Sequence, residues 1–270
     1  MSNKKILSYY ERRGLDIVSE YLVDHIVTCS EFLGELKSSK IGRFCTSLHE
    51  DFSEAIRLSV FFHDIGKVFY QYGRGKRYIA FTGHEILSFF MFKEFAKKLK
   101  ENPEIDITAD TALFSVFFHH HAMGIKRRVN NIKNLDPLKK ISYNVFQDLL
   151  SDLSLTVDRC ISSDEFKILS SVINEISEKI FNGSININYI IRDSEGGICQ
   201  LWEKITSNDE NSIRFKKLAY SVLSVLVCVD NLSAQKLRKS TTTGFTKILE
   251  EFYNDYLKTW DISLPTSLLT

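Results

Sequence analysis

Three residues in one short stretch of the chain combine an imidazole, a carboxylate and an ammonium group. An apolar run ends at His63 and Asp64, and Lys67 follows four residues after His63. A carboxylate directly after two phenylalanines is costly to bury unless a cation or hydrogen bonds offset the cost. Imidazole and carboxylate together suit a divalent metal ion, and we expect Gly66 to loosen the backbone where such a site opens. The strength of this prediction depends on the other histidines.

Most of the other histidines also lie near apolar segments with helical periodicity. Of the seven histidines, only His49 lies among ordinary polar residues. The six that lie near apolar segments are His25, His63, His84, His119, His120 and His121. Consecutive helical residues point about 100° apart, so the run of three cannot all face one metal ion. Residues 59–64 and 115–120 share five of six amino acids. By this echo His119 corresponds to His63 and His120 to Asp64, and these two are the predicted ligands of the run.

An aspartate on the most apolar helical segment completes the set of candidate ligands. Asp230 shares a stripe with Leu223 and Ala234 at helical spacing, so its carboxylate must be paired, protonated or bound to metal. A buried hydrogen bond is the alternative for Asp230, as a core histidine bonded to backbone is for His25. Together the histidines and two aspartates suffice for two metal ions that share one carboxylate. Such a pair, about 3.5–4 Å apart, activates water and offsets charge on a phosphorane-like transition state.

Helices must position these residues. Apolar periodicity predicts helices over about 15–36, 52–64, 86–95, 109–121, 137–153, 164–181, 214–235 and 245–256. Thr82 and Glu85 are spaced as a capping box, which we prefer to a catalytic role for Glu85. Alternating polar and apolar residues in 183–192 predict a small β-hairpin around 184–202. The expected fold is therefore all-α, with this hairpin as a local excursion, in a single domain over residues 1–270.

Composition limits the class of protein. Apolar residues make up 44% of the 270 residues, and 35 Lys and Arg balance 34 Asp and Glu, so global charge does not indicate a nucleic-acid partner. The five cysteines show no CxxC spacing, which is typical of reduced thiols in the cytoplasm. The most apolar run, about 218–229, is shorter than the ~20 residues of a membrane span. We therefore expect a cytoplasmic protein with no membrane segment.

Basic residues follow the candidate ligand motifs along the chain. These residues form three clusters. The first cluster is Arg74, Lys76 and Arg77, with Tyr72 and Tyr78 beside it. The second is Lys126, Arg127 and Arg128, and the third is Lys236, Arg238 and Lys239. Such residues could supply phosphate contacts and a stacking platform for a single strand. A solvated rim is the alternative for each cluster alone.

The ordered motifs resemble the HD superfamily of metal-dependent phosphohydrolases. The matching positions span residues 25 to 234 and are His25, His63-Asp64, Lys67, His84, His119-His120 and Asp230. Within that superfamily the chain looks like the stand-alone HD nuclease subunit of type I CRISPR systems, through its HDIGK motif, Gly83-His-Glu85 with Ser88, the paired histidines and the late VDNLSA segment. The resemblance implies an all-α HD fold that cleaves single-stranded DNA, and RNA as a further substrate. It also implies a separate helicase subunit and an RNA-guided surveillance complex as partners.

The resemblance also implies roles for individual residues. One metal ion would be held by His25, His63, Asp64 and Asp230, and Asp64 would bridge to a second ion. That second ion would be held by His84, His119 and His120, while Lys67 would contact the scissile phosphate, so that Asp64 and Lys67 are the expected catalytic residues. The two divalent ions could be Mn, Ni, Fe, Co or Mg. We expect a transition ion to support more activity than Mg²⁺, because Mg²⁺ prefers oxygen ligands.

Two other functions compete with the nuclease. An HD phosphohydrolase acting on nucleotides or cyclic dinucleotides shares the HDIGK motif, but the Gly-Tyr-Pro segment usual in the cyclic dinucleotide enzymes is replaced here by His121-Ala-Met-Gly124. A non-catalytic assembly module would keep metal only for stability. Replacing Asp64 by alanine separates this module from either enzyme, because a structural site loses folding with its metal whereas a catalytic site loses turnover while the protein stays folded.

Overall fold

Helices dominate the computed structural model, which describes residues 5–99, 107–120, 124–207, 209–239 and 243–258. The helices are α1 (Leu22–Glu31), α2 (Lys40–Leu48), α3 (Phe52–Phe62), α4 (His84–Leu99), α5 (Ile107–Phe118), α6 (Ile125–Leu135), α7 (Asn144–Leu153), α8 (Ser163–Phe181), α9 (Ile187–Thr206), α10 (Glu210–Arg238) and α11 (Gly244–Phe252). Short helical turns are η1 (Leu36–Ser38), η2 (Ile65–Gly73), η4 (Pro137–Lys139), η5 (Ser154–Thr156) and η6 (Tyr253–Leu257). The predicted all-α class is confirmed.

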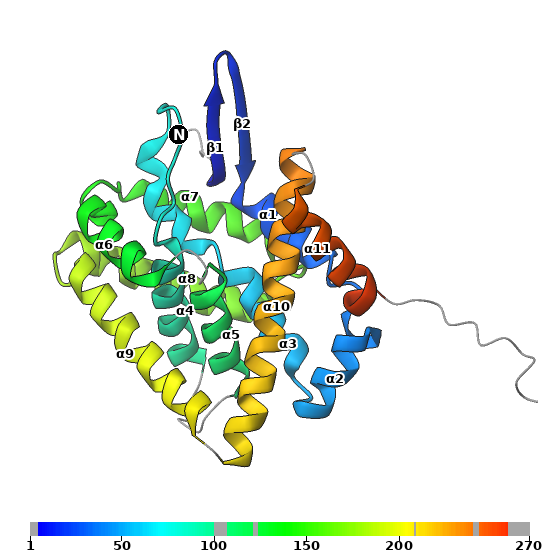
Figure 1. Cartoon of the computed structure of the whole chain (residues 1–270). Coiled ribbons are helices and arrows are strands. Elements are labelled where there is room, and N and C mark those ends of the chain that lie inside the picture. The colour runs from blue at the N-terminus through cyan, green and yellow to red at the C-terminus, as the bar shows by residue number, and fades with distance from the viewer. Residues whose placement is uncertain (1–4, 100–106, 121–123, 208, 240–242, 259–270) are drawn as a thin grey trace, which may run out of the picture.

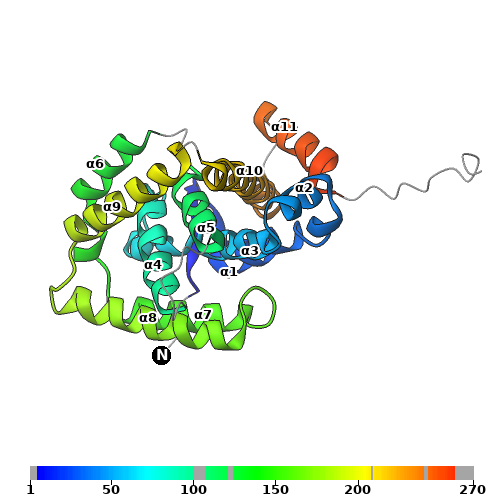
Figure 2. The same cartoon turned by 90° about the horizontal axis from the view of Figure 1, so that it is seen from below.

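The centre of the fold is a group of phenylalanine-rich helices. Figures 1 and 2 show α3, α4 and α5 enclosed by α8, α9 and α10, in agreement with the packing of α5 on α3, α4 and α10. Phe62 of α3 stacks on Phe92 of α4 with ring centroids 4.4 Å apart. Because α3 and α5 pack on one another and are followed directly by His63 and His119, the core itself brings the two candidate ligand motifs together.

The longest helix, α10, has the length and apolar content of a membrane span. More than half of its most apolar 18-residue stretch is buried within the described part of the fold. It packs against α1, α3 and α5. A core helix of this kind produces the same hydropathy pattern as a span. Its burial also explains how Asp230, near its end, reaches the centre of the molecule.

The β-hairpin lies at the other end of the chain from its predicted place. Strands β1 (Leu7–Arg13) and β2 (Asp16–Tyr21) pair antiparallel and extend from the helical body above α1 (Figure 1). The prediction of one helix from residue 15 was therefore wrong up to residue 21. The buried side chains of these strands include Ser8 and Glu20, so the strands lack the apolar alternation that would have revealed them. Gly14, with φ of +64°, allows the tight turn.

Residues 184–202, where the hairpin was predicted, belong mainly to α9. Asn186 caps this helix by accepting from the Tyr189 amide at 3.0 Å. The isoleucines that alternate near its start continue at helical spacing as Ile190, Ile191 and Ile198, all buried. A Cβ at Gly197 would lie 3.0 Å from the Phe89 ring, so this glycine permits close packing of α9 on α4 and does not form a turn.

Candidate metal centre

The similar sequences of residues 59–64 and 115–120 form two equivalent helix ends. The His63 amide donates to the Ser59 carbonyl at 3.0 Å, as the His119 amide does to that of Ser115, also at 3.0 Å. The Nδ1 atoms of both histidines lie 2.7 Å from the carbonyl oxygen three residues earlier. A donated Nδ1–H leaves the Nε2 lone pair free for a metal ion. The same local sequence thus orients both imidazoles in the same way.

His84 joins these two histidines from the first turn of α4. Its Nδ1 lies 2.6 Å from the carbonyl oxygen of Phe81, and its Nε2 lies 2.9 Å from Oδ1 of Asp64. Gly66 allows this approach, because a Cβ there would lie 2.3 Å from the His84 carbonyl oxygen. The Gly66 amide donates to Oγ of Ser88 at 2.8 Å. Gly66 is therefore needed for close packing of η2 on α4, not for the loosening expected from the sequence.

The opposite side of Asp64 faces α1 and α10. Nε2 of His25 lies 3.1 Å from Oδ1 of Asp230, 3.2 Å from Nε2 of His63 and 3.6 Å from Oδ2 of Asp64. Both histidines are fully buried. Residues separated by more than two hundred positions therefore point their ligand atoms into one small volume.

These contacts define two sets of donors that share Asp64. Among the described residues, two groups that contain Asp64 place their ligand atoms within 4.8 Å of one another, and a third group, His25, Cys29 and His63, overlaps the first of them. The first set is His25, His63, Asp64 and Asp230, and the second set is Asp64, His84, His119 and His120. The predicted ligands thus come together, and either set could hold a metal ion. His121 lies outside the described residues.

The unpaired atoms of this buried cluster fit a metal ion. Among the described residues, Nε2 of His119, Nε2 of His84 and Oδ1 of Asp64 are buried without a hydrogen bond of good geometry. Nδ1 of His25, on the side of Glu20, is a further such atom. Unsatisfied buried polar atoms are rare in folded proteins. Here the first three converge, and they are the nitrogen and oxygen donors that transition metal ions prefer.

The cluster keeps its carboxylates ionised despite their burial. Burial alone would raise the pKa of Asp64, but the ammonium group of Lys67, together with His63 and His84, holds it well below its usual range. Lys67 forms an ion pair with Oδ2 of Asp64, and its Nζ lies 5.4 Å from the centre of the Phe81 ring. A charged carboxylate is the form that binds metal.

The imidazoles of the two sets differ in their affinity for protons. Burial, with neighbouring histidines, lowers the pKa of His119 well below its usual value and that of His120 to about 4. Burial also opposes the charging of His25, but Cys29 and the carboxylates of Asp230 and Glu20 outweigh it and raise the His25 pKa well above its usual value. In the metal-free protein, His25 therefore keeps its proton to higher pH than His119 and His120 do.

We expect metal binding to the first set to be the more pH-dependent. Its ligand His25 must release a proton, so affinity should rise about tenfold per pH unit below the His25 pKa. His119 and His120 have no proton to lose between pH 6 and 8. Calorimetric titration with Mn²⁺ in buffers of different ionisation enthalpy counts the released protons. Equal proton release at both sites would contradict this assignment.

Arg128 is not the surface phosphate contact that the sequence predicted. It is buried and forms a two-point ion pair with the Glu85 carboxylate. Glu85 is thereby a structural partner of α6. The prediction failed because residues 43 positions apart meet only in the folded chain.

Replacing Arg128 by methionine should destabilise the protein and leave its intrinsic nucleic-acid affinity unchanged. The buried Glu85 carboxylate would lose its partner, which typically costs about 3–5 kcal/mol in free energy of unfolding. Arg127, exposed beside it, provides the matched control: Arg127→Met should keep stability and weaken binding if this face contacts phosphate. Urea unfolding and DNA titration measure the two effects. Weaker binding by a fully stable Arg128→Met protein would restore the original interpretation.

The other predicted basic residues lie closer to solvent. Lys76 and Arg77 are exposed, as are Lys126 and Arg127. Arg74 is half-buried and binds the Lys5 carbonyl and Oε1 of Gln71, so it anchors the base of the hairpin. The ammonium groups of Lys76 and Lys140 lie 5.4 and 5.3 Å from the centre of the Tyr72 ring. A surface hollow is lined by Tyr70, Tyr72, Lys76, Arg77 and exposed Tyr78, and we call it the basic and aromatic hollow.

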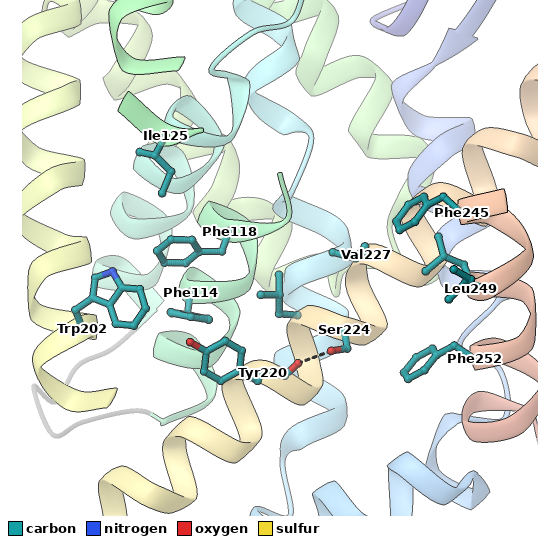
Figure 3. A pocket seen from close by; sticks show the side chains of 12 residues that line it. Phe114, Phe118, Ile125, Trp202, Tyr220, Ser224, Val227, Phe245, Leu249 and Phe252 are labelled. Carbon is teal, nitrogen blue, oxygen red and sulfur yellow. Dashed lines mark hydrogen bonds between the residues drawn. The ribbon is translucent and has the colours of Figure 1, made fainter. Parts of the chain in front are cut away.

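An apolar groove of about 600 Å³ adjoins the ligand motifs of α5 and α10. Phe118 directly precedes His119, and Val227 lies one helical turn before Asp230. Figure 3 shows aromatic side chains along both walls, from α5, α9 and α10 on one side and from α11 on the other. Trp202 and Tyr220 are partly exposed there. This surface could not be predicted from the sequence, because its residues come from separate helices.

Glu20 belongs to the surroundings of the centre but has no recognisable motif in the sequence. Oε1 of Glu20, on β2, lies 2.8 Å from Nδ1 of His25. An isolated glutamate in a segment that resembled a helix carries no local signal of such a role.

No protein-family model, curated protein or solved structure matches this chain. The function must therefore be argued from the geometry of the metal centre and the order of its motifs.

Proposed function

We propose that this protein is a metal-dependent nuclease of the HD superfamily, which hydrolyses phosphodiester bonds of single-stranded DNA with two divalent ions. The observation that carries the proposal is the sharing of Asp64 between two sets of donors. A shared carboxylate is how two ions are held at the short separation used in phosphodiester hydrolysis. The order of these ligands along the chain is the order in which the superfamily resemblance requires them.

The first set of ligands would hold one ion and the second set the other, with Asp64 between them. When bound, such ions polarise a phosphodiester and lower the pKa of water. Lys67 would bind the scissile phosphate, since its ammonium group lies beside Asp64 at a position that is 7% exposed. The backbone carbonyls bound by His63, His84 and His119 keep the imidazoles oriented throughout.

Two surfaces support a polymeric substrate over a free nucleotide. Lys76, Arg77, Tyr72 and Tyr78 combine positive charge with aromatic rings, and this hollow includes Tyr70, whose hydroxyl donates to the Thr82 carbonyl at 2.6 Å, two residues before His84. The lining of the aromatic groove includes Phe118, the residue before His119. Bases of a single strand stack on such side chains without sequence preference. A helicase subunit and an RNA-guided complex, both cytoplasmic, are the partners proposed from the CRISPR resemblance.

The proposal is tested by hydrolysis assays on metal-stripped protein resupplied with Mn²⁺, Ni²⁺, Co²⁺, Fe²⁺ or Mg²⁺. End-labelled single-stranded DNA, duplex DNA, single-stranded RNA and a cyclic dinucleotide would be offered in parallel. The Asp64→Ala protein controls for contaminating nucleases. We expect metal-dependent cleavage of single strands that is absent in the variant. Hydrolysis of the cyclic dinucleotide with intact DNA would instead establish the phosphohydrolase alternative.

A further inference from the structure

The carboxylate of Glu20 is in direct contact with the first set of ligands but is not itself among the donors. It lies on β2, is 3% exposed, and places Oε1 at 2.8 Å from Nδ1 of fully buried His25. The other ring nitrogen of His25 faces Asp230 at 3.1 Å. His25 therefore lies between a glutamate on one side and the metal ligands on the other.

This arrangement distinguishes His25 from the other buried histidines of the centre. Nδ1 of His63, His84 and His119 each faces a backbone carbonyl oxygen at 2.6–2.7 Å. A carboxylate is a stronger hydrogen-bond acceptor than a carbonyl oxygen. It fixes the tautomer of a metal-binding histidine and raises the basicity of the opposite nitrogen.

Glu20 is itself held in place from two further elements. Oγ of Ser8, on β1, donates to Oε1 at 2.5 Å, and Nε of Arg238, at the end of α10, donates to Oε2 at 2.7 Å. The Arg238 guanidinium lies 4.1 Å from the centre of the Tyr9 ring. The hairpin and the end of α10 thus fix the carboxylate with which His25 pairs.

We propose that Glu20 is a positioning residue, which orients His25 and strengthens it as a ligand, so that the first set of donors binds its metal ion more tightly. The inference rests on the proposed two-metal function and extends it to a residue outside the ligand set. It also assigns a role to the hairpin, whose strands supply both Glu20 and the serine that holds it.

The Glu20→Gln protein tests this inference through metal binding without any assay of hydrolysis. The amide keeps the size of the side chain but removes its charge. Absorption titration of metal-stripped protein with Co²⁺ should show two equivalents in the wild type. In the variant we expect one equivalent to bind about 10–100-fold more weakly, as for other carboxylate partners of metal-bound histidines, and the second to be unchanged.

Asp152→Asn provides the matched control. Oδ2 of Asp152 accepts from the Ile6 amide at 2.5 Å, so it too is a buried carboxylate that holds the start of the hairpin, but it does not contact a ligand. We expect this variant to retain both Co²⁺ affinities. A similar loss of affinity in both variants would mean that the hairpin acts only by supporting the fold, and would overturn the role of Glu20.

A second measurement uses the unaltered protein, in case the glutamine variant does not fold. In the Zn²⁺-loaded protein, the Nδ1 proton of His25 should resonate downfield of those of His63, His84 and His119, because Nδ1 of His25 lies 2.8 Å from a carboxylate oxygen whereas the other three face backbone carbonyl oxygens. Equivalent resonances, or unchanged affinities in Glu20→Gln, would overturn the inference and leave the metal centre standing. Failure of the wild type to bind two equivalents would instead refute the proposed function.

Discussion

Replacement of Asp64 by asparagine should abolish hydrolysis and release bound metal while the protein stays folded. Asp64 is the only residue common to both sets of donors, so neither ion keeps its full set of ligands. Metal ions contribute several kcal/mol to transition-state stabilisation, and about 4 kcal/mol corresponds to a roughly thousandfold loss of rate. Steady-state hydrolysis and metal content of the purified variant measure the effect.

Asparagine is preferred to alanine for this test because of Lys67. The ammonium of Lys67 pairs with Oδ2 of Asp64, and an amide oxygen can still accept its hydrogen bond. Asp110→Asn is the matched control, since Asp110 also pairs with a lysine, Lys204, but lies outside both donor sets. We expect that control to retain activity. Unfolding of Asp64→Asn on loss of its metal, with a wild type that hydrolyses no substrate, would favour the structural module.

Removal of metal should lower the melting temperature by roughly 10 °C. Binding at a thousand times the dissociation constant stabilises the folded state by about 4 kcal/mol, and each kcal/mol shifts a protein of this size by about 2–4 °C. Five imidazoles and two carboxylates form the donor sets, so Mn²⁺ should restore the lost stability better than Mg²⁺, which prefers oxygen.

Thermal unfolding of the chelated protein, with each ion added back, provides the measurement. Asp64→Asn should show little response to added metal, because both sites are incomplete. Identical melting curves for the wild type with and without chelator and Mn²⁺ would argue against a resident metal centre. A full response to Mg²⁺ alone would contradict the expected preference for transition ions.

The separate ligand motifs were predictable because each is built from local structure. A histidine at the end of an apolar helix bonds to the carbonyl three residues before it, as His63 and His119 do. The shared sequence of 59–63 and 115–119 therefore sufficed to predict two equivalent candidate ligands. The helical periodicity of α3, α8 and α10 was equally visible, because one face of each helix packs on the core.

Relations between distant segments were decided only by tertiary structure. Glu20 meets His25 through a hairpin whose inward side chains are partly polar, and Arg128 meets Glu85 between two helices. The identity of a charged residue does not predict whether its side chain will face solvent or a buried partner. What the sequence determined about this protein was its helical class and the residues that come together as candidate ligands. The fold alone decided which carboxylate supports His25 and which arginine is buried, because those energies come from contacts that exist only after the helices pack.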